Sequence, residues 1–98
     1  MAAIICIDYY QKEQYQLLLQ TATDRDKLDA TYDGWLKSFR KAFSSIKKSG
    51  FEPVKVNVDV KELLAYCIVQ GLENNAITRS QFCADLAKEG KWETIENN

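Results

Sequence analysis

The longest regular pattern of apolar positions lies in the middle of the chain. Seven apolar side chains recur at helical spacing and form one stripe about 100° wide, which is typical of an amphipathic helix lying on a core. Thr23 followed by Asp26 matches a capping box, and Gly50 stands where the helix would end. The pattern therefore predicts a helix over about residues 24–49, with this stripe: Leu28, Tyr32, Trp35, Leu36, Phe39, Phe43 and Ile46.

After Gly50 the period changes from 3.6 to 2. Val54, Val56 and Val58 alternate with polar residues, which predicts a short half-buried strand. Asp59 then has the position of a helix N-cap, and the apolar positions that follow predict a helix up to Gly71. A last helix is expected from about Thr78, with Gln81 completing a capping box, to Gly90.

The first twenty residues allow two interpretations. Residues 4–7 are either a short strand that pairs beside residues 54–58, or the start of a helix that continues to Ala22. We favour the strand, followed by a helix from about Tyr9 to Thr21 with Asp8 as its cap. The predicted order is (β)-α-α-β-α-α, a mostly helical α+β fold in one domain over residues 1–98. Residues 91–98 are expected to be a polar tail that is either flexible or packed on its own core.

Composition narrows the class of protein. The chain has 98 residues, 46% of them hydrophobic, and its 13 Lys and Arg against 14 Asp and Glu leave a net charge of −1. This balance argues against a disordered chain and against a general binder of nucleic acid or membranes. The N-terminus has no basic region before its short apolar run, so we expect no signal peptide. Three cysteines without close spacing favour a reducing, cytoplasmic location.

Catalytic motifs are missing from the sequence. It contains no histidine and no glycine-rich phosphate loop, so we expect a non-enzymatic protein with no metal or cofactor. Asp26, Asp29 and Asp33 share one side of the predicted long helix. We interpret them as ordinary acidic residues near a helix N-terminus, where they complement the dipole.

One basic surface is a candidate partner site. Lys37, Lys41 and Lys48 fall together on the outer face of the long helix and form either a surface for an acidic partner or an ordinary solvated face. Trp92 lies beyond the last predicted helix and is either a partner anchor or a residue that folds back over the core. These four residues form the predicted partner surface.

Residues 53–90 resemble a ribbon-helix-helix repressor. The resemblance is carried by the alternating strand, the capped helix, and a second helix that opens Thr78-Arg79-Ser80-Gln81-Phe82. It implies two chains that pair their strands, with Lys55 and Asn57 reading base edges and the region of Arg79 holding a backbone phosphate. Residues 51–90 nevertheless contain four basic and six acidic side chains, and we expect nucleic acid not to be the partner.

The function expected from the sequence is therefore a small domain that acts through protein–protein contact or self-association. Residues 54–58 need a strand partner, from residues 4–7 or from a second chain, and we expect a homodimer as well as an unidentified protein partner. The alternative is a DNA-binding regulator of ribbon-helix-helix type.

Overall fold

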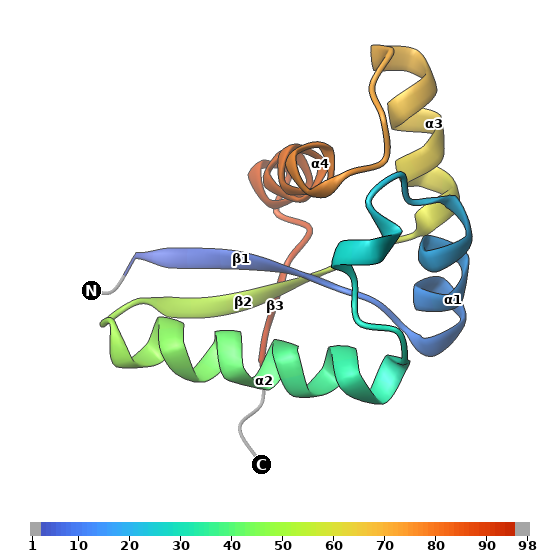
Figure 1. Cartoon of the computed structure of the whole chain (residues 1–98). Helices are drawn as coiled ribbons and strands as arrows, with labels where there is room; N and C mark the ends of the chain where they lie inside the picture. Colours follow the sequence, from blue (N-terminus) through green and yellow to red (C-terminus); the bar gives the residue numbers. More distant parts are fainter. Residues whose placement is uncertain (1–2, 96–98) are drawn as a thin grey trace.

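Two helices enclose a small twisted sheet, one helix on each of its faces (Figure 1). The computed structural model describes residues 3–95. In chain order its elements are β1 (Ile4–Tyr9), α1 (Lys12–Thr21), the short 3₁₀ helix η1 (Arg25–Lys27), α2 (Tyr32–Lys48), β2 (Glu52–Asn57), α3 (Val60–Gln70), α4 (Ala76–Lys88) and β3 (Glu93–Thr94). The α+β class that the sequence predicts is confirmed.

The sheet has the order β1-β2-β3, with β2 in the middle. β1 pairs with β2 in parallel, so that Cys6 lies beside Val54 and Tyr9 beside Asn57. β3 pairs antiparallel with β2 over two residues only. Residues 4–7 are thus a strand, and the partner of residues 54–58 comes from the same chain.

The two faces of β2 differ as its alternation predicts. Val54 and Val56 are fully buried on the side of α4. Lys55 lies on the opposite side, where its ammonium group is over the ring of Tyr9. Val54 and Val56 therefore hold α4 to the sheet, whereas Lys55 and Asn57 lie on the face toward α2.

The long helix begins later than predicted. α2 starts at Tyr32, and the hydroxyl of its N-cap Thr31 accepts a hydrogen bond from the Gly34 N–H. Thr23 does not cap it, since its N–H donates to the carbonyl of Asn74, and Asp24 is bonded to Arg79. Residues 24–31 thus form a separate segment that is tied to the start of α4.

Other helix ends are partly as expected. α3 has the predicted cap, where the Asp59 carboxylate accepts from the N–H groups of Lys61 and Glu62, and it ends at Gly71 in the left-handed conformation with φ +66°. α1 begins at Lys12 rather than Tyr9, because Tyr9 is the last residue of β1.

The last helix and the tail also differ from expectation. α4 begins at Ala76 with Asn75 as its cap, and the predicted cap Thr78 is buried inside the first turn. The predicted tail includes β3, so residues 93–94 belong to the sheet. Trp92 is 37% exposed. The rest of the predicted tail, residues 96–98, lies outside the described residues.

An aromatic core fills the space between β1 and the helices. Tyr10 and Tyr15 are fully buried, and the Tyr15 hydroxyl donates to the carbonyl of Asp29. Trp35 packs against this core from α2. Within residues 3–95, no helix is both long and apolar enough to cross a membrane.

Candidate functional site: a basic groove beside α2

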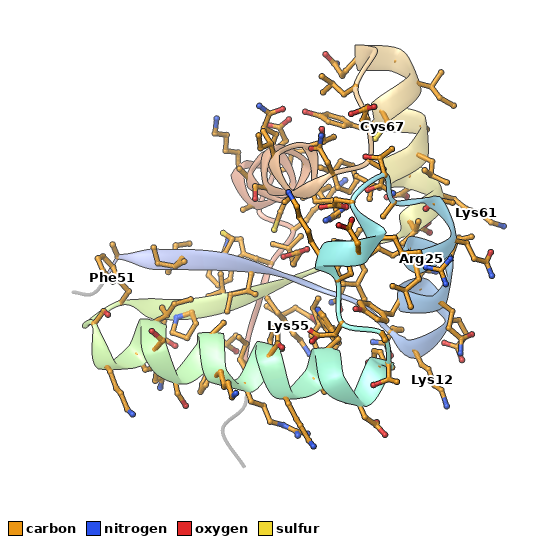
Figure 2. All side chains as sticks on the ribbon, viewed as in Figure 1. Lys12, Arg25, Phe51, Lys55, Lys61 and Cys67 are labelled. Atoms are coloured by element: carbon orange, nitrogen blue, oxygen red, sulfur yellow. The ribbon has the colours of Figure 1, made fainter. Side chains whose placement is uncertain are left out.

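An open groove of about 1210 Å³ lies between α2 and the side of the sheet formed by β2 and β3. Lys55 approaches it from β2, between the sheet and α2 (Figure 2). Leu36, Phe39 and Phe43 give it an apolar wall, and Tyr9 contributes an aromatic ring from β1. We call this surface the α2 groove; its charged lining residues are Arg40, Lys47, Lys48, Lys55 and Glu93.

The groove exists because the sheet is narrow. β3 is only two residues long, so the sheet covers only part of the apolar face of α2, and none of the α2 side chains is fully buried. Leu36, Arg40, Phe43 and Lys47 follow one another at spacings of four and three, which places them along one flank of the helix. This flank combines apolar and cationic side chains.

Two lysines of the groove lie over aromatic rings. The Lys55 ammonium is 4.8 Å from the centroid of Tyr9, and the Lys47 ammonium is 5.5 Å from that of Phe43. Tyr9 also makes an edge contact with Phe39, with ring centroids 5.2 Å apart. Each cation–π contact at an exposed site contributes about 0.5–1 kcal/mol. These contacts restrain the two lysines at the groove.

Positive charge is concentrated in the groove. Of the described residues that line the groove, four are cations and one, Glu93, is a carboxylate, which accepts a hydrogen bond of 2.5 Å from the Asn57 amide. Among residues 3–95, no carboxylate lies within 4.0 Å of the nitrogen atoms of these four cations. The chain as a whole has a net charge of −1, so the groove differs strongly from the average surface. It can neutralise anionic groups while its wall covers apolar ones.

The structure brings together only part of the predicted partner surface. Lys48 lines the groove, and together with Lys41 it also lines a shallow hollow on the outer side of α2. Lys37 is exposed on the same helix, and Trp92 does not line the groove. Arg40 and Lys47, which lie in the basic half of the helix but outside the predicted partner surface, join Lys48 in the groove.

The residues predicted to read DNA are also separated. Lys55 and Asn57 lie on the same face of β2. Arg79 is only 6% exposed, and its guanidinium donates to both oxygens of Asp24, at 3.0 and 2.8 Å. It also donates to the carbonyl and the side-chain oxygen of Asn74. Arg79 therefore connects α4 to the segment before α2, within the fold.

The sequence contained part of the signal for the groove. The spacing of Phe43 and Lys47 already places them as neighbours on a helix. The contact of Tyr9 with Lys55 depends on the parallel register of β1 and β2, which local periodicity does not specify.

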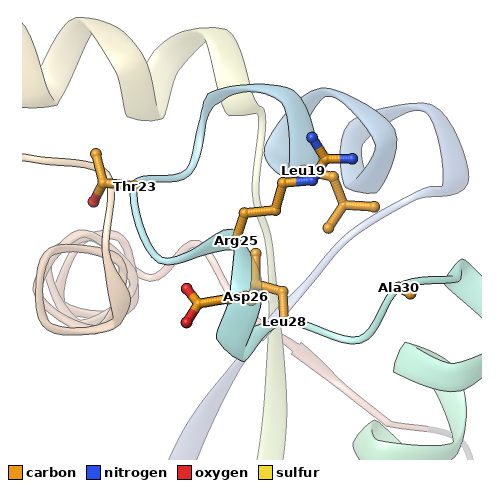
Figure 3. A pocket seen from close by; sticks show the side chains of 6 residues that line it. All are labelled: Leu19, Thr23, Arg25, Asp26, Leu28 and Ala30. Atoms are coloured by element: carbon orange, nitrogen blue, oxygen red, sulfur yellow. The ribbon is translucent and has the colours of Figure 1, made fainter.

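A second, smaller hollow of about 570 Å³ lies beside the segment before α2. Figure 3 shows the Arg25 guanidinium and the Asp26 carboxylate pointing in different directions from η1. The charged groups of this hollow do not converge, in contrast to those of the α2 groove.

No known protein family, curated protein or solved structure matches the chain.

Proposed function

We propose that this domain is a non-enzymatic cytoplasmic binding module whose α2 groove takes an acidic segment of another protein. The observation that carries the proposal is the gathering of Arg40, Lys47, Lys48 and Lys55 around an apolar wall. Complementary charge steers association and fixes orientation, while buried apolar and aromatic contacts supply most of the affinity. The three free thiols are compatible with a reducing compartment.

The state of the aromatic rings favours a peptide over single-stranded nucleic acid. Proteins that bind single strands offer open ring faces on which bases stack. Here lysine ammonium groups lie over the rings of Tyr9 and Phe43. The apolar wall formed by Leu36 and Phe39 instead suits aliphatic or aromatic side chains that alternate with carboxylates.

A DNA-binding regulator of ribbon-helix-helix type is kept as the second proposal. The common face of Lys55 and Asn57 is the observation in its favour. Against it, β2 already has a strand of its own chain on each side, and Arg79 is bonded within the fold. Titrations with an acidic peptide and with duplex DNA distinguish the peptide-binding function from the DNA-binding function.

The test is a fluorescence anisotropy titration with a short labelled peptide that is rich in glutamate and has two leucines at its centre. The groove variant is Arg40→Gln/Lys47→Gln/Lys48→Gln. The matched control, Lys12→Gln/Arg25→Gln/Lys61→Gln, removes the same charge from exposed positions on α1, η1 and α3 (Figure 2). At about 0.5 kcal/mol for each exposed charge, the groove variant should raise the Kd about tenfold. The control should change it less than about twofold.

Further probes decide between the interpretations. A peptide with glutamine in place of glutamate should bind much more weakly, and added salt should weaken the binding of the acidic peptide. Equal effects of the two triple variants, or no binding of the acidic peptide, would contradict the proposed groove. Tighter binding of duplex DNA than of the peptide, lost in Lys55→Gln, would favour the second proposal.

A further inference from the structure

The shallow hollow on the outer side of α2 is lined only by hydrogen-bond donors of two kinds, cations and hydroxyls. Its volume is about 530 Å³, and none of the described residues that line it carries a carboxylate. We call it the outer hollow; its lining residues are Arg40, Lys41, Ser44, Ser45, Lys48 and Ser49.

The helical repeat of α2 explains both the shape of the outer hollow and its chemistry. Residues four apart are neighbours on a helix, so Arg40, Ser44 and Lys48 form one row along the helix surface. Lys41 and Ser45 belong to a second row beside the first. Serine side chains are short, and those of arginine and lysine are long. The hydroxyls therefore form the floor of the outer hollow, and the charged groups form its rim.

The donors of the outer hollow are available to a ligand. Within residues 3–95, no carboxylate lies within 4.0 Å of the nitrogen atoms of its three cations. The Ser49 hydroxyl donates to the Ser45 carbonyl, whereas the hydroxyls of Ser44 and Ser45 bond to none of the described residues. The only acidic residue of α2 is Asp33, in the first turn. The outer hollow thus offers three unpaired cations and two free hydroxyls.

This set of donors suits a phosphate monoester better than a carboxylate. A carboxylate has a single charge and two oxygens, so three cations around it would remain largely uncompensated. A phosphoserine carries a charge of about −1.5 to −2 near pH 7 and three strong acceptor oxygens. Arginine can bind it through two parallel hydrogen bonds. The outer hollow therefore matches a dianion in both charge and number of donors.

We propose that the acidic segment bound in the α2 groove carries a phosphoserine, whose phosphate is bound in the outer hollow. The proposal rests on the proposed function and names the class of its ligand. Arg40, Ser44 and Lys48 line both the groove and the outer hollow, so the two surfaces are continuous. The apolar wall of the groove contacts the side chains next to the phosphate. Free phosphate and a lipid headgroup have no such side chains.

The phosphate is expected near Ser44. Helix dipoles disfavour an anion at the C-terminus, and Ser49 is the C-cap of α2. Ser44 lies inside the helix, where residues three and four positions away in either direction are its neighbours. All four of these neighbours are cations: Arg40, Lys41, Lys47 and Lys48. A phosphate above the Ser44 hydroxyl is thus surrounded by positive charge.

Three labelled peptides test the phosphate site by fluorescence anisotropy. Each is the glutamate-rich peptide with two leucines, and they differ at one position beside the leucines, which is serine, glutamate or phosphoserine. The phosphopeptide should bind about tenfold more tightly than the serine peptide, through new charge-assisted hydrogen bonds. It should also bind more tightly than the glutamate peptide. Equal Kd values for phosphoserine and glutamate would overturn the phosphate site and leave the groove standing. If none of the three binds, the proposed function is contradicted as well.

A matched pair of variants locates the phosphate. Lys41 lines the outer hollow but not the groove, and Lys37, one turn earlier on α2, lines neither. Both lysines are exposed. Lys41→Glu should abolish most of the preference for the phosphopeptide over the serine peptide, while Lys37→Glu should leave this preference unchanged within about twofold. Circular dichroism checks the fold of both. A preference that survives Lys41→Glu, or that the two variants reduce equally, would overturn the proposal.

Vesicles and inorganic phosphate identify the source of the phosphate group. Inorganic phosphate should displace the phosphopeptide only at a concentration far above the Kd of the peptide, because it makes no contact with the apolar wall. Phosphatidylcholine vesicles that contain phosphatidylinositol bisphosphate should not sediment the protein. Sedimentation that Lys41→Glu abolishes, together with equal binding of the phosphopeptide and the serine peptide, would assign the outer hollow to a membrane and overturn the proposal.

Discussion

Arg79 carries a positive charge that is almost completely removed from solvent. The Asp24 carboxylate and two oxygens of Asn74 occupy its guanidinium. Asp24 in addition accepts from the Ala76 N–H at the start of α4. A buried ion pair of this kind contributes little net stability compared with an apolar pair, but the loss of one partner leaves a buried charge uncompensated. The stability of the fold is therefore sensitive to Asp24.

Replacing Asp24 by Asn should lower the free energy of unfolding by about 3–5 kcal/mol, because the Arg79 charge loses its partner. Asp26→Asn is the matched control, since Asp26 is exposed two residues further along the chain. It should change stability by less than about 0.5 kcal/mol. Urea denaturation measures both. Similar losses in the two variants would show that the position of the carboxylate in the fold is unimportant.

The same pair gives the domain a defined acid dependence. The hydrogen bonds from Arg79 hold the pKa of Asp24 below its usual value of 3.8. The folded state thus favours the ionised carboxylate. The contribution of Asp24 to the free energy of unfolding is fully present above the pKa that Asp24 has in the unfolded chain. It is lost as the pH falls through the lower pKa of the folded state. The stability difference between wild type and Asp24→Asn should therefore narrow as the pH falls from about 5 toward 2.

At the level of the element, the start of α2 shows why a helix is easier to predict from the sequence than the residue at which it begins. The apolar stripe over residues 32–46 lies within α2, as predicted. Thr23 and Thr31 are both suitable caps by residue type, and the choice between them depends on Asp24 and Asn74, which bind partners some fifty residues away in the chain. Local patterns do not contain that contact. Asp59 and Gly71, whose capping partners lie within one turn, were predicted correctly.

A substitution at Gly34 tests the close contact between this residue and the cap Thr31 at the start of α2. A Cβ at this position would lie 3.1 Å from the Thr31 hydroxyl, which accepts the Gly34 N–H. In the wild type this close contact should cancel the gain in helix propensity that alanine brings, so Gly34→Ala should not raise the free energy of unfolding. In a Thr31→Ala background the contact is removed, and the same change should stabilise by up to about 1 kcal/mol. Urea denaturation of the four proteins gives the coupling, and equal effects in both backgrounds would contradict the close contact.

For the whole molecule, the buried thiols report on global unfolding. Cys83 is 4% exposed, and burial raises its pKa to about 12. At neutral pH it should react with iodoacetamide only when the domain unfolds. For a stability of at least about 5 kcal/mol, labelling should be more than a thousandfold slower than in the urea-unfolded chain. Peptide mass spectrometry measures the rate, and labelling of native Cys83 at the unfolded rate would contradict its burial.

The class of the fold followed from the sequence, while the α2 groove did not. The alternating residues of β2 predicted that strand, and a strand was the favoured interpretation of the apolar residues of β1. Whether the two strands pair within one chain or between two was left open by the sequence, and the structure shows that they pair within the chain. β3 was missed, because two residues, Glu93 and Thr94, are too few for a period to be visible. The groove depends on this short strand and on the register that brings Lys55 to Tyr9. Both are properties of the assembled sheet, which is why the lysines alone indicated only a basic helix face.

The parallel pairing of β1 with β2 also sets a delay during synthesis. β1 is complete when Tyr9 is added, but the segment from Tyr10 to Phe51 must be made before β2 begins. At about 5–20 residues per second this takes roughly 2–8 s. Throughout that time both edges of the apolar strand lack a partner. The sheet can therefore form only after residue 57 of 98 has been added, so more than half of the chain must be made before β1 gains its partner.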